Sequence, residues 1–132
     1  MIVTAFSQLV KPASAPSDGG DSNPFEEQAR RMTIAAGAST SSRLAWSSAG
    51  ALHLAWIDAR DGTVGVYHKA SRNGGLTFGP DRAIARGFDA VAGLSLSASL
   101  TDRTAGIAWQ GRLQGNGTTH VYVAASSDDG RT

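Results

Sequence analysis

The residues whose types could support chemistry are few, and each also has a structural interpretation. Arg60 and Asp61 form an adjacent charged pair in a segment that is predicted to be a turn. An aspartate followed by glycine is typical of a hairpin turn, and the neighbouring arginine is interpreted as a solvated or salt-bridging side chain. Trp46, Trp56 and Trp109 could be platforms on which a sugar stacks, but their positions inside predicted strands favour core packing.

Metal, thiol and nucleotide chemistry have no support in the sequence. His53, His68 and His120 lie on three predicted strands without the spacing of metal ligands, so they are interpreted as core or rim residues. The chain has no cysteine, which excludes a disulfide framework and a thiol nucleophile. No glycine-rich loop follows a strand and opens a helix, so no nucleotide or other cofactor is expected.

The composition describes one modest domain of 132 residues. Twelve basic and 11 acidic residues give a net charge of +1, so no nucleic-acid partner is expected. No apolar run approaches the roughly 18 residues of a membrane span. The apolar N-terminal stretch lacks a basic segment, so the chain is not expected to carry a signal peptide. Sixteen glycines and four prolines suit a turn-rich β protein.

The stretch that organises the chain runs from Ser71 to Phe78 and is predicted to form a stapled hairpin corner. Gly75 and the glycine before it allow a backbone with positive φ. The short side chains of Ser71 and Asn73 can bond back to the nearby backbone and close the turn. Thr77 and Phe78 then restart an extended segment, with the aromatic ring placed to pack under the turn.

The corner is repeated along the chain. Four residues near the C-terminus match Ser71, Asn73, Gly75 and Thr77 in type and spacing, namely Ser126, Asp128, Gly130 and Thr132. A degenerate copy near the start keeps Asp18 and Gly20. The interval from Asp18 to Asn73 equals the interval from Asn73 to Asp128, at 55 residues. A period near 50 with short strands between the marks is typical of propeller blades.

The pattern Ser-x-Asp-x-Gly-x-Thr-aromatic resembles the Asp-box, or BNR repeat, of sialidase-like β-propellers. Ser71 to Phe78 follows it with Asn73 in the aspartate position, and Ser126 to Thr132 follows it as far as the threonine. The segment 54–62, followed by Tyr67, is also similar to bacterial members of this group. The resemblance implies an all-β fold of four-stranded antiparallel propeller blades, in which the boxes are structural turns.

The resemblance divides the chain into three units. Residues 1–36 would end a preceding blade with the degenerate Asp-box, 37–90 would form a complete blade with the box at 71–78, and 91–132 would form a truncated blade ending in the box at 126–132. The expected strands are 31–35, 44–46, 51–57, 64–70, 82–85, 94–100, 104–109 and 119–125, with 37–42 as a linker. Because propellers use roughly 4–8 blades, the chain is expected to be a fragment or a protomer that completes a ring by assembly.

The resemblance also implies a place for catalysis. In sialidase-like enzymes the active site lies on the face opposite the boxes, where an arginine cluster holds a carboxylate and an aspartate acts as general acid. Arg60 and Asp61 would stand on that face and are the catalytic candidates, and Arg112, Gln114, Asn116 and Asp89 would lie nearby. The family's arginine motif at a first strand is absent, and no matching tyrosine–glutamate nucleophile is identifiable. Hydrolysis by this chain alone is therefore not expected.

Three hypotheses about function follow from the resemblance. In the first, a full-length parent is an exo-α-sialidase-like glycoside hydrolase, secreted or exposed on a cell surface, that acts on or binds glycans. The alternative is a non-catalytic propeller that binds a glycan or a protein. In the third, the fragment has no function apart from its parent. The expected partners are a glycan, the remaining blades, or a second copy of the chain at open blade faces.

Overall fold

The computed structural model describes residues 29–33, 35–48 and 50–132. The chain separates into two compact units, Met1–Ile34 and Ala35–Thr132. In the first unit, the described residues 29–33 form neither a helix nor a regular strand, so the strand expected at 31–35 does not appear among them. The corner predicted at Asp18 and Gly20 lies outside the described residues.

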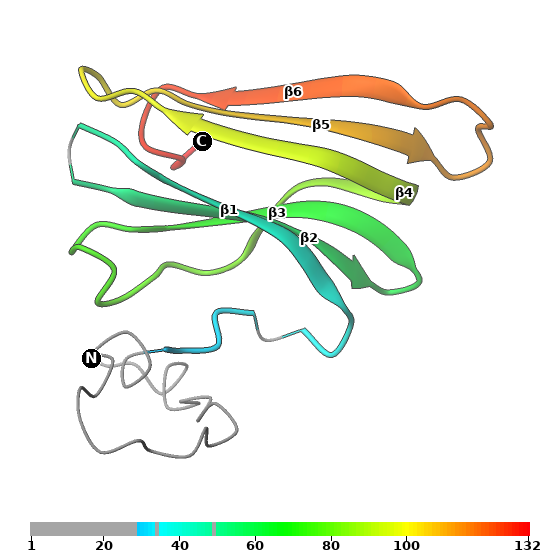
Figure 1. The fold of residues 1–132 in the computed structure, drawn as a ribbon, viewed down its shortest axis with the longest axis horizontal. Coiled ribbons are helices and arrows are strands. Elements are labelled where there is room, and N and C mark those ends of the chain that lie inside the picture. Colours follow the sequence, from blue (N-terminus) through cyan, green and yellow to red (C-terminus); the bar gives the residue numbers. More distant parts are fainter. Residues whose placement is uncertain (1–28, 34, 49) are drawn as a thin grey trace, which may run out of the picture. The chain divides into compact units, whose positions relative to one another are not determined.

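The second unit consists of six strands, so the prediction of an all-β fold is confirmed. They are β1 (Ser39–Trp46), β2 (Leu52–Arg60), β3 (Thr63–Ser71), β4 (Arg82–Ala98), β5 (Ala105–Leu113) and β6 (His120–Ser126). Each strand pairs antiparallel with the next, which gives one sheet in chain order. The sheet curls into a half-barrel (Figure 1). No helix in the described part of the chain is long and apolar enough to cross a membrane.

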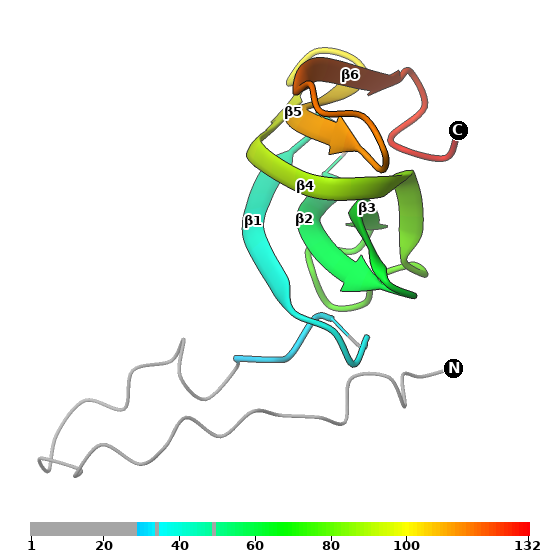
Figure 2. The ribbon, with the colours of Figure 1, turned by 90° about the vertical axis from the view of Figure 1, so that its right-hand side faces the viewer.

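The curl is made by β4, which bends across the unit (Figure 2). Its first part pairs with β3 and its second part with β5, and Phe88 at the bend pairs with both Val64 and Leu113. Register shifts occur on both sides of the bend, where Gly87 and Gly93 have positive φ. Such bulges bend a strand and increase its twist. The two separate strands expected at 82–85 and 94–100 are therefore one bent strand, and position 90 lies inside it.

The bend divides the sheet into two arms. The first arm comprises β1, β2, β3 and β4 up to Phe88, and the second arm comprises the rest of β4 with β5 and β6. An apolar core includes residues of both arms, namely Ala55, Ile57, Val66, Phe88, Leu94, Ile107 and Trp109. The rings of Trp109 and Tyr122 stack, and Phe88 meets both edge-on. These contacts hold the second arm against the first.

The start of β1 corrects the prediction of a linker at 37–42. The strand begins at Ser39 and pairs with β2 from Ser39 opposite Asp58. A register shift between Thr40 and Arg43 interrupts the ladder. Seven of its eight residues are exposed, so backbone pairing forms this strand without the apolar alternation that sequence patterns detect.

Candidate functional site

Arg60 belongs to a buried ionic network on one face of the first arm. Its Nη2 atom lies 2.9 Å from Asp58 Oδ2 and 2.7 Å from Asp81 Oδ2. Its guanidinium carbon lies 4.0 Å from the centre of the Tyr67 ring. Burial by itself lowers the pKa of Arg60, but the hydrogen bonds to Asp81 and Asp58 outweigh it and raise the pKa. The guanidinium is therefore already bound by partners on β2 and on the connection from β3 to β4.

Both carboxylates that bind Arg60 also bind other side chains. Asp58, which is fully buried, also accepts hydrogen bonds from Trp56 Nε1 at 3.0 Å and from Ser39 Oγ at 3.2 Å. Asp81 binds Lys69 Nζ at 2.8 Å, so its two oxygens link a lysine to an arginine. Because every charge here has an opposite charge beside it, burial is tolerated. The arrangement holds the connection from β3 to β4 against the sheet.

Asp61 lies at the exposed tip of the hairpin between β2 and β3. Its φ is 53° and that of Gly62 is 75°, which is the pair of positive values that a two-residue hairpin turn of type I′ requires. The ionic hydrogen bonds of Arg60 go to Asp58 and Asp81 rather than to Asp61. The catalytic roles that the resemblance implies for Arg60 and Asp61 stay a prediction.

The other candidate residues divide by position. Arg112, Gln114 and Asn116 are exposed near the end of β5, where Asn116 Oδ1 accepts a hydrogen bond from the Thr118 N–H. Asp89 is exposed on β4. These side chains are available to solvent.

The three tryptophans also divide by position. Trp56 and Trp109 are 1% and 4% exposed, so both are packed in the interior. Trp46 is 49% exposed at the end of β1, so it presents part of its ring to solvent.

The Ser71 corner, residues 71–77, is closed by side-chain hydrogen bonds. Ser71 Oγ accepts from the N–H of Asn73 at 3.4 Å and of Gly75 at 2.8 Å, and it donates to Asn73 Oδ1. Asn73 Oδ1 accepts from the Thr77 N–H at 2.9 Å, and Asn73 Nδ2 donates to Thr77 Oγ1. Phe78, which follows the corner, is half-buried. These bonds satisfy backbone donors that the sheet does not pair.

The Ser126 corner, residues 126–132, is closed by matching bonds, except that here the threonine hydroxyl donates and the Arg131 N–H also donates to Asp128 Oδ1. Ser126 Oγ accepts from the N–H of Asp128 and of Gly130, and it donates to Asp128 Oδ1. Asp128 also accepts from the N–H and the hydroxyl of Thr132. The hydrogen bonds from Ser126 and from Thr132 hold the pKa of Asp128 well below its usual range. The corner therefore favours the charged form of this carboxyl group.

The Ser126 corner docks onto the first arm through Asp129, which is 3% exposed. Asp129 Oδ1 accepts a hydrogen bond from Ser47 Oγ at 2.8 Å and lies 3.8 Å from His53 Nε2. Its other oxygen lies 3.8 Å from Arg103 Nε. Arg72 Nη2 donates to the backbone carbonyl of Asp129 at 3.3 Å. Residues far apart in the sequence thus meet at one buried carboxylate.

The two histidines beneath this corner are neutral at ordinary pH. His53 Nδ1 and His68 Nε2 share a hydrogen bond of 3.0 Å, and both rings are buried. Burial, and to a lesser extent electrostatic repulsion from His53, Arg82 and Arg72, lowers the pKa of His68 to about 4. Burial also lowers the pKa of His53, although the charge of Asp129 opposes this. The interpretation of these two residues as core histidines is in line with their burial.

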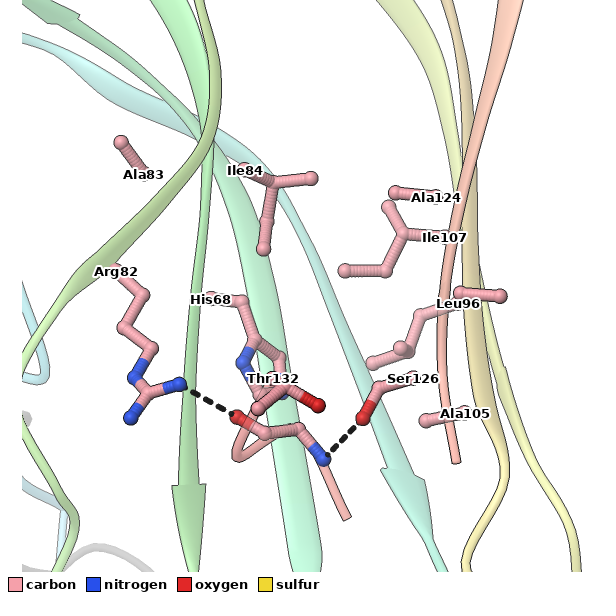
Figure 3. Close-up of a pocket in the computed structure, with 12 residues that line it drawn as sticks. His68, Arg82, Ala83, Ile84, Leu96, Ala105, Ile107, Ala124, Ser126 and Thr132 are labelled. Atoms are coloured by element: carbon pink, nitrogen blue, oxygen red, sulfur yellow. Dashed lines mark hydrogen bonds between the residues drawn. The ribbon is translucent and has the colours of Figure 1, made fainter. Parts of the chain in front are cut away.

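A pocket of about 300 Å³ lies beside the docked corner, between the two arms (Figure 3). Its walls are mostly apolar, and polar groups gather where the corner approaches Arg82 and His68. The lining residues are His68, Arg82, Ala83, Ile84, Leu96, Ala105, Ile107, Ala124, Ala125, Ser126, Gly130 and Thr132. A smaller pocket of about 70 Å³ shares His68, Arg82 and Gly130 with it.

Sequence reasoning missed both polar clusters, although one signal was present. The two-residue turn at 61–62 sets the pairing of β2 with β3, and this register places His53 opposite Ala70 and His68 opposite Ala55. The two histidines therefore share a face of the sheet on neighbouring strands. No comparable signal links Asp129 or Asp81 to their partners, because those contacts depend on how the loops fold back.

The described residues contain no group of three or more histidine, cysteine, aspartate or glutamate side chains that could hold a metal ion. No protein-family model and no curated protein matches the chain.

Proposed function

We propose that the chain is a segment of a sialidase-like β-propeller and that it supplies packed blades, without a catalytic site of its own, to a larger glycan-binding or protein-binding structure. The observation that supports this most strongly is the pair of corners. The Ser71 corner follows β3, the third strand of the first arm, and the Ser126 corner follows β6, the third strand of the second arm. The two corners are 55 residues apart. In both, the serine hydroxyl accepts from the glycine N–H, and the residue two positions after the serine accepts from the threonine N–H.

The open surfaces of the second arm support a role in assembly. Val121 and Val123 on β6 are each 72% exposed, and β6 is an edge strand that pairs only with β5 in the described sheet. Leu44 and Trp46 at the opposite edge are 59% and 49% exposed. Clustered apolar exposure on a sheet face and unpaired strand edges are typical of surfaces that another chain or blade covers. The proposal places a further blade or a second copy of the chain there.

The state of Arg60 supports the non-catalytic form of the proposal. An arginine that holds a substrate carboxylate must present its guanidinium to the ligand, whereas Arg60 already binds Asp58 and Asp81. A glycosidase also requires two carboxyl groups at a defined separation across the scissile bond. Under this proposal, hydrolysis of a sialoside by a secreted or cell-surface parent needs groups from other blades.

Assembly is tested by the solution mass of the purified chain. We expect oligomers in light scattering, and we expect Val121→Glu with Val123→Glu to shift them toward monomer because the charges oppose burial of the β6 face. Leu100→Glu, at an exposed loop position, is the matched control and should leave the mass unchanged. A monodisperse wild-type monomer with little dye binding to apolar surface would contradict the proposal.

The absence of catalysis is tested separately with a fluorogenic sialoside. Wild type, Arg60→Ala and Asp61→Asn should all give turnover equal to the buffer blank, because members of a catalytic set act as a unit and this chain lacks most of the set. Turnover by wild type that both substitutions abolish, in variants that remain folded by circular dichroism, would place an active site in this segment.

A further inference from the structure

We propose that the pocket between the two arms, together with the smaller arginine-lined pocket that adjoins it, is a binding site for a small organic anion that has an apolar body. The site lies where Arg72 of the Ser71 corner meets Asp129 of the Ser126 corner, and it does not depend on the propeller proposal. The ligand class is one aromatic ring system or short hydrocarbon chain carrying a single carboxylate or sulfonate.

The apolar part of the site has a definite origin in the sequence. Four lining residues are alanines at positions where larger side chains would fill the space, namely Ala83, Ala105, Ala124 and Ala125. Between them, Ile84 from the first arm faces Leu96 and Ile107 from the second arm (Figure 3). Apolar walls and a volume of about 300 Å³ match the lower end of the size range of small-molecule sites.

The charged part of the site consists of three arginines. Arg82 lines both pockets, and Arg72 and Arg131 line the smaller one. Arg82 Nη1 donates to the backbone carbonyls of Gly130, at 3.2 Å, and of Arg131, and Arg72 donates to that of Asp129. These acceptors carry no formal charge. Within the described part of the chain, no side-chain carboxylate forms an ion pair with Arg72, Arg82 or Arg131.

Among the described residues, the side chains that line the two pockets carry no negative charge. None of the described residues that line either pocket is an aspartate or a glutamate. Lys69, which lines the smaller pocket, already binds Asp81. Ser126 and Thr132 add hydroxyl groups at the edge of the larger pocket. A ligand with an apolar body and one negative charge would place each part against the matching surface.

The test uses three probes on the full 132-residue chain, measured by isothermal titration calorimetry at pH 7. The first is 2-naphthoate, which has both features, the second is the neutral isostere 2-naphthamide, and the third is acetate, which has the charge without the ring. We expect 2-naphthoate to bind more tightly than either. Raising the salt concentration to about 0.5 M should weaken the binding of 2-naphthoate and leave the binding of 2-naphthamide unchanged.

Two kinds of variant separate the two halves of the site. Arg82→Gln and Arg131→Gln should each weaken 2-naphthoate about twofold to fivefold while 2-naphthamide is unaffected. Arg43→Gln is the matched control, because Arg43 is also exposed and also donates to a backbone carbonyl but lies on β1 outside the pocket. Ala124→Leu should abolish binding of both naphthalene probes because the added side chain fills the pocket.

Specific outcomes would overturn the proposal. Equal affinity for 2-naphthoate and 2-naphthamide would show that the arginines do not contribute to binding through the charge of the ligand. Equal weakening by Arg82→Gln and Arg43→Gln would show only an effect of net charge. Unchanged binding in Ala124→Leu, with thermal unfolding confirming that the variant is folded, would place the probe elsewhere on the molecule.

Discussion

The Ser71 corner and the Ser126 corner share most of their internal hydrogen bonds but lie in different surroundings. In both, a serine hydroxyl accepts two backbone N–H groups and the residue two positions later accepts from the threonine N–H. Gly75 in the first corner would bring an added Cβ to 3.3 Å from the flexible tip of Leu52. Gly130 in the second would bring one to 2.6 Å from the buried ring of His68. The hydrogen bonds that close each turn therefore depend on nearby residues of the chain, whereas the side chains that pack against the turn are set by the tertiary structure.

The residue before each of these glycines shows what the difference does. Gly74 and Asp129 both have positive φ, 71° and 59°. Glycine adopts this backbone without strain, whereas an aspartate there is uncommon and is retained where surrounding contacts stabilise it. Asp129 has such contacts with Ser47, His53 and Arg103. The Ser126 corner is thus a turn that also makes buried contacts through Asp129, whereas the Ser71 corner has no buried carboxylate at the equivalent position.

The largest expected effect comes from crowding the docked corner. Gly130→Val should lower the free energy of unfolding by roughly 2–5 kcal/mol, because the left-handed backbone is strained and the His68 ring cannot move aside. Gly75→Val should cost roughly 1–3 kcal/mol from backbone strain, with Leu52 free to adjust. Urea unfolding of both variants measures the difference. Equal losses would mean that the Ser126 corner is not docked as described.

The next effect is a pH dependence that belongs to the docked corner. Because the folded pKa of His68, about 4, lies below its ordinary value of 6.5, the unfolded chain binds more protons between these values. The free energy of unfolding should therefore fall as the pH is lowered from 6.5 to about 4, by up to about 3 kcal/mol.

Urea unfolding across this pH range measures the effect. His68→Gln should flatten the slope, and His120→Gln, at an exposed position, should not. A slope that is the same in wild type and His68→Gln would contradict the burial of a neutral histidine.

A smaller effect tests whether the serine hydrogen bonds of the two corners contribute equally to stability. Ser71→Ala and Ser126→Ala each remove an acceptor from two backbone N–H groups, so each should cost roughly 1–3 kcal/mol, and the two losses should agree. Ser97→Ala, on the open face of β4, is the control and should have almost no effect. A loss confined to one corner would show that the shared hydrogen bonds do not contribute equally to stability.

The smallest effect concerns the exchange of Asn73 and Asp128. Asn73→Asp should change the free energy of unfolding at pH 7 by less than about 0.5 kcal/mol, because the Thr77 hydroxyl can turn to donate to the carboxylate as Thr132 does. Its carboxyl should acquire a lowered pKa, so the stability that the charged form gives the Ser71 corner should decrease as the pH falls from about 4 toward that lowered pKa. Asp128→Asn should remove the same behaviour from the Ser126 corner. Titration of the Thr77 and Thr132 amide resonances would detect either outcome, and an acid response that stays with the original corner would contradict it.

The sequence alone determined the features that depend on neighbours in the chain. The sequence predicted β2, β3, β5 and β6 close to their observed bounds, and Asp61-Gly62 predicted the hairpin between β2 and β3. The short side chains of Ser71 and Asn73 predicted a corner closed by local hydrogen bonds. Residue type and spacing are sufficient for such features because the interacting groups lie only a few positions apart.

The tertiary structure alone decided how these parts meet. The early start of β1 required pairing with β2, and the joining of two expected strands into β4 required both arms to pack on Phe88. The ion pair of Arg60 with Asp81, the docking of Asp129 onto the first arm and the pocket between the arms arise from residues about 20 to 80 positions apart. Such contacts form only when the loops fold back over the sheet, because their geometry depends on bends and register shifts that no local pattern encodes.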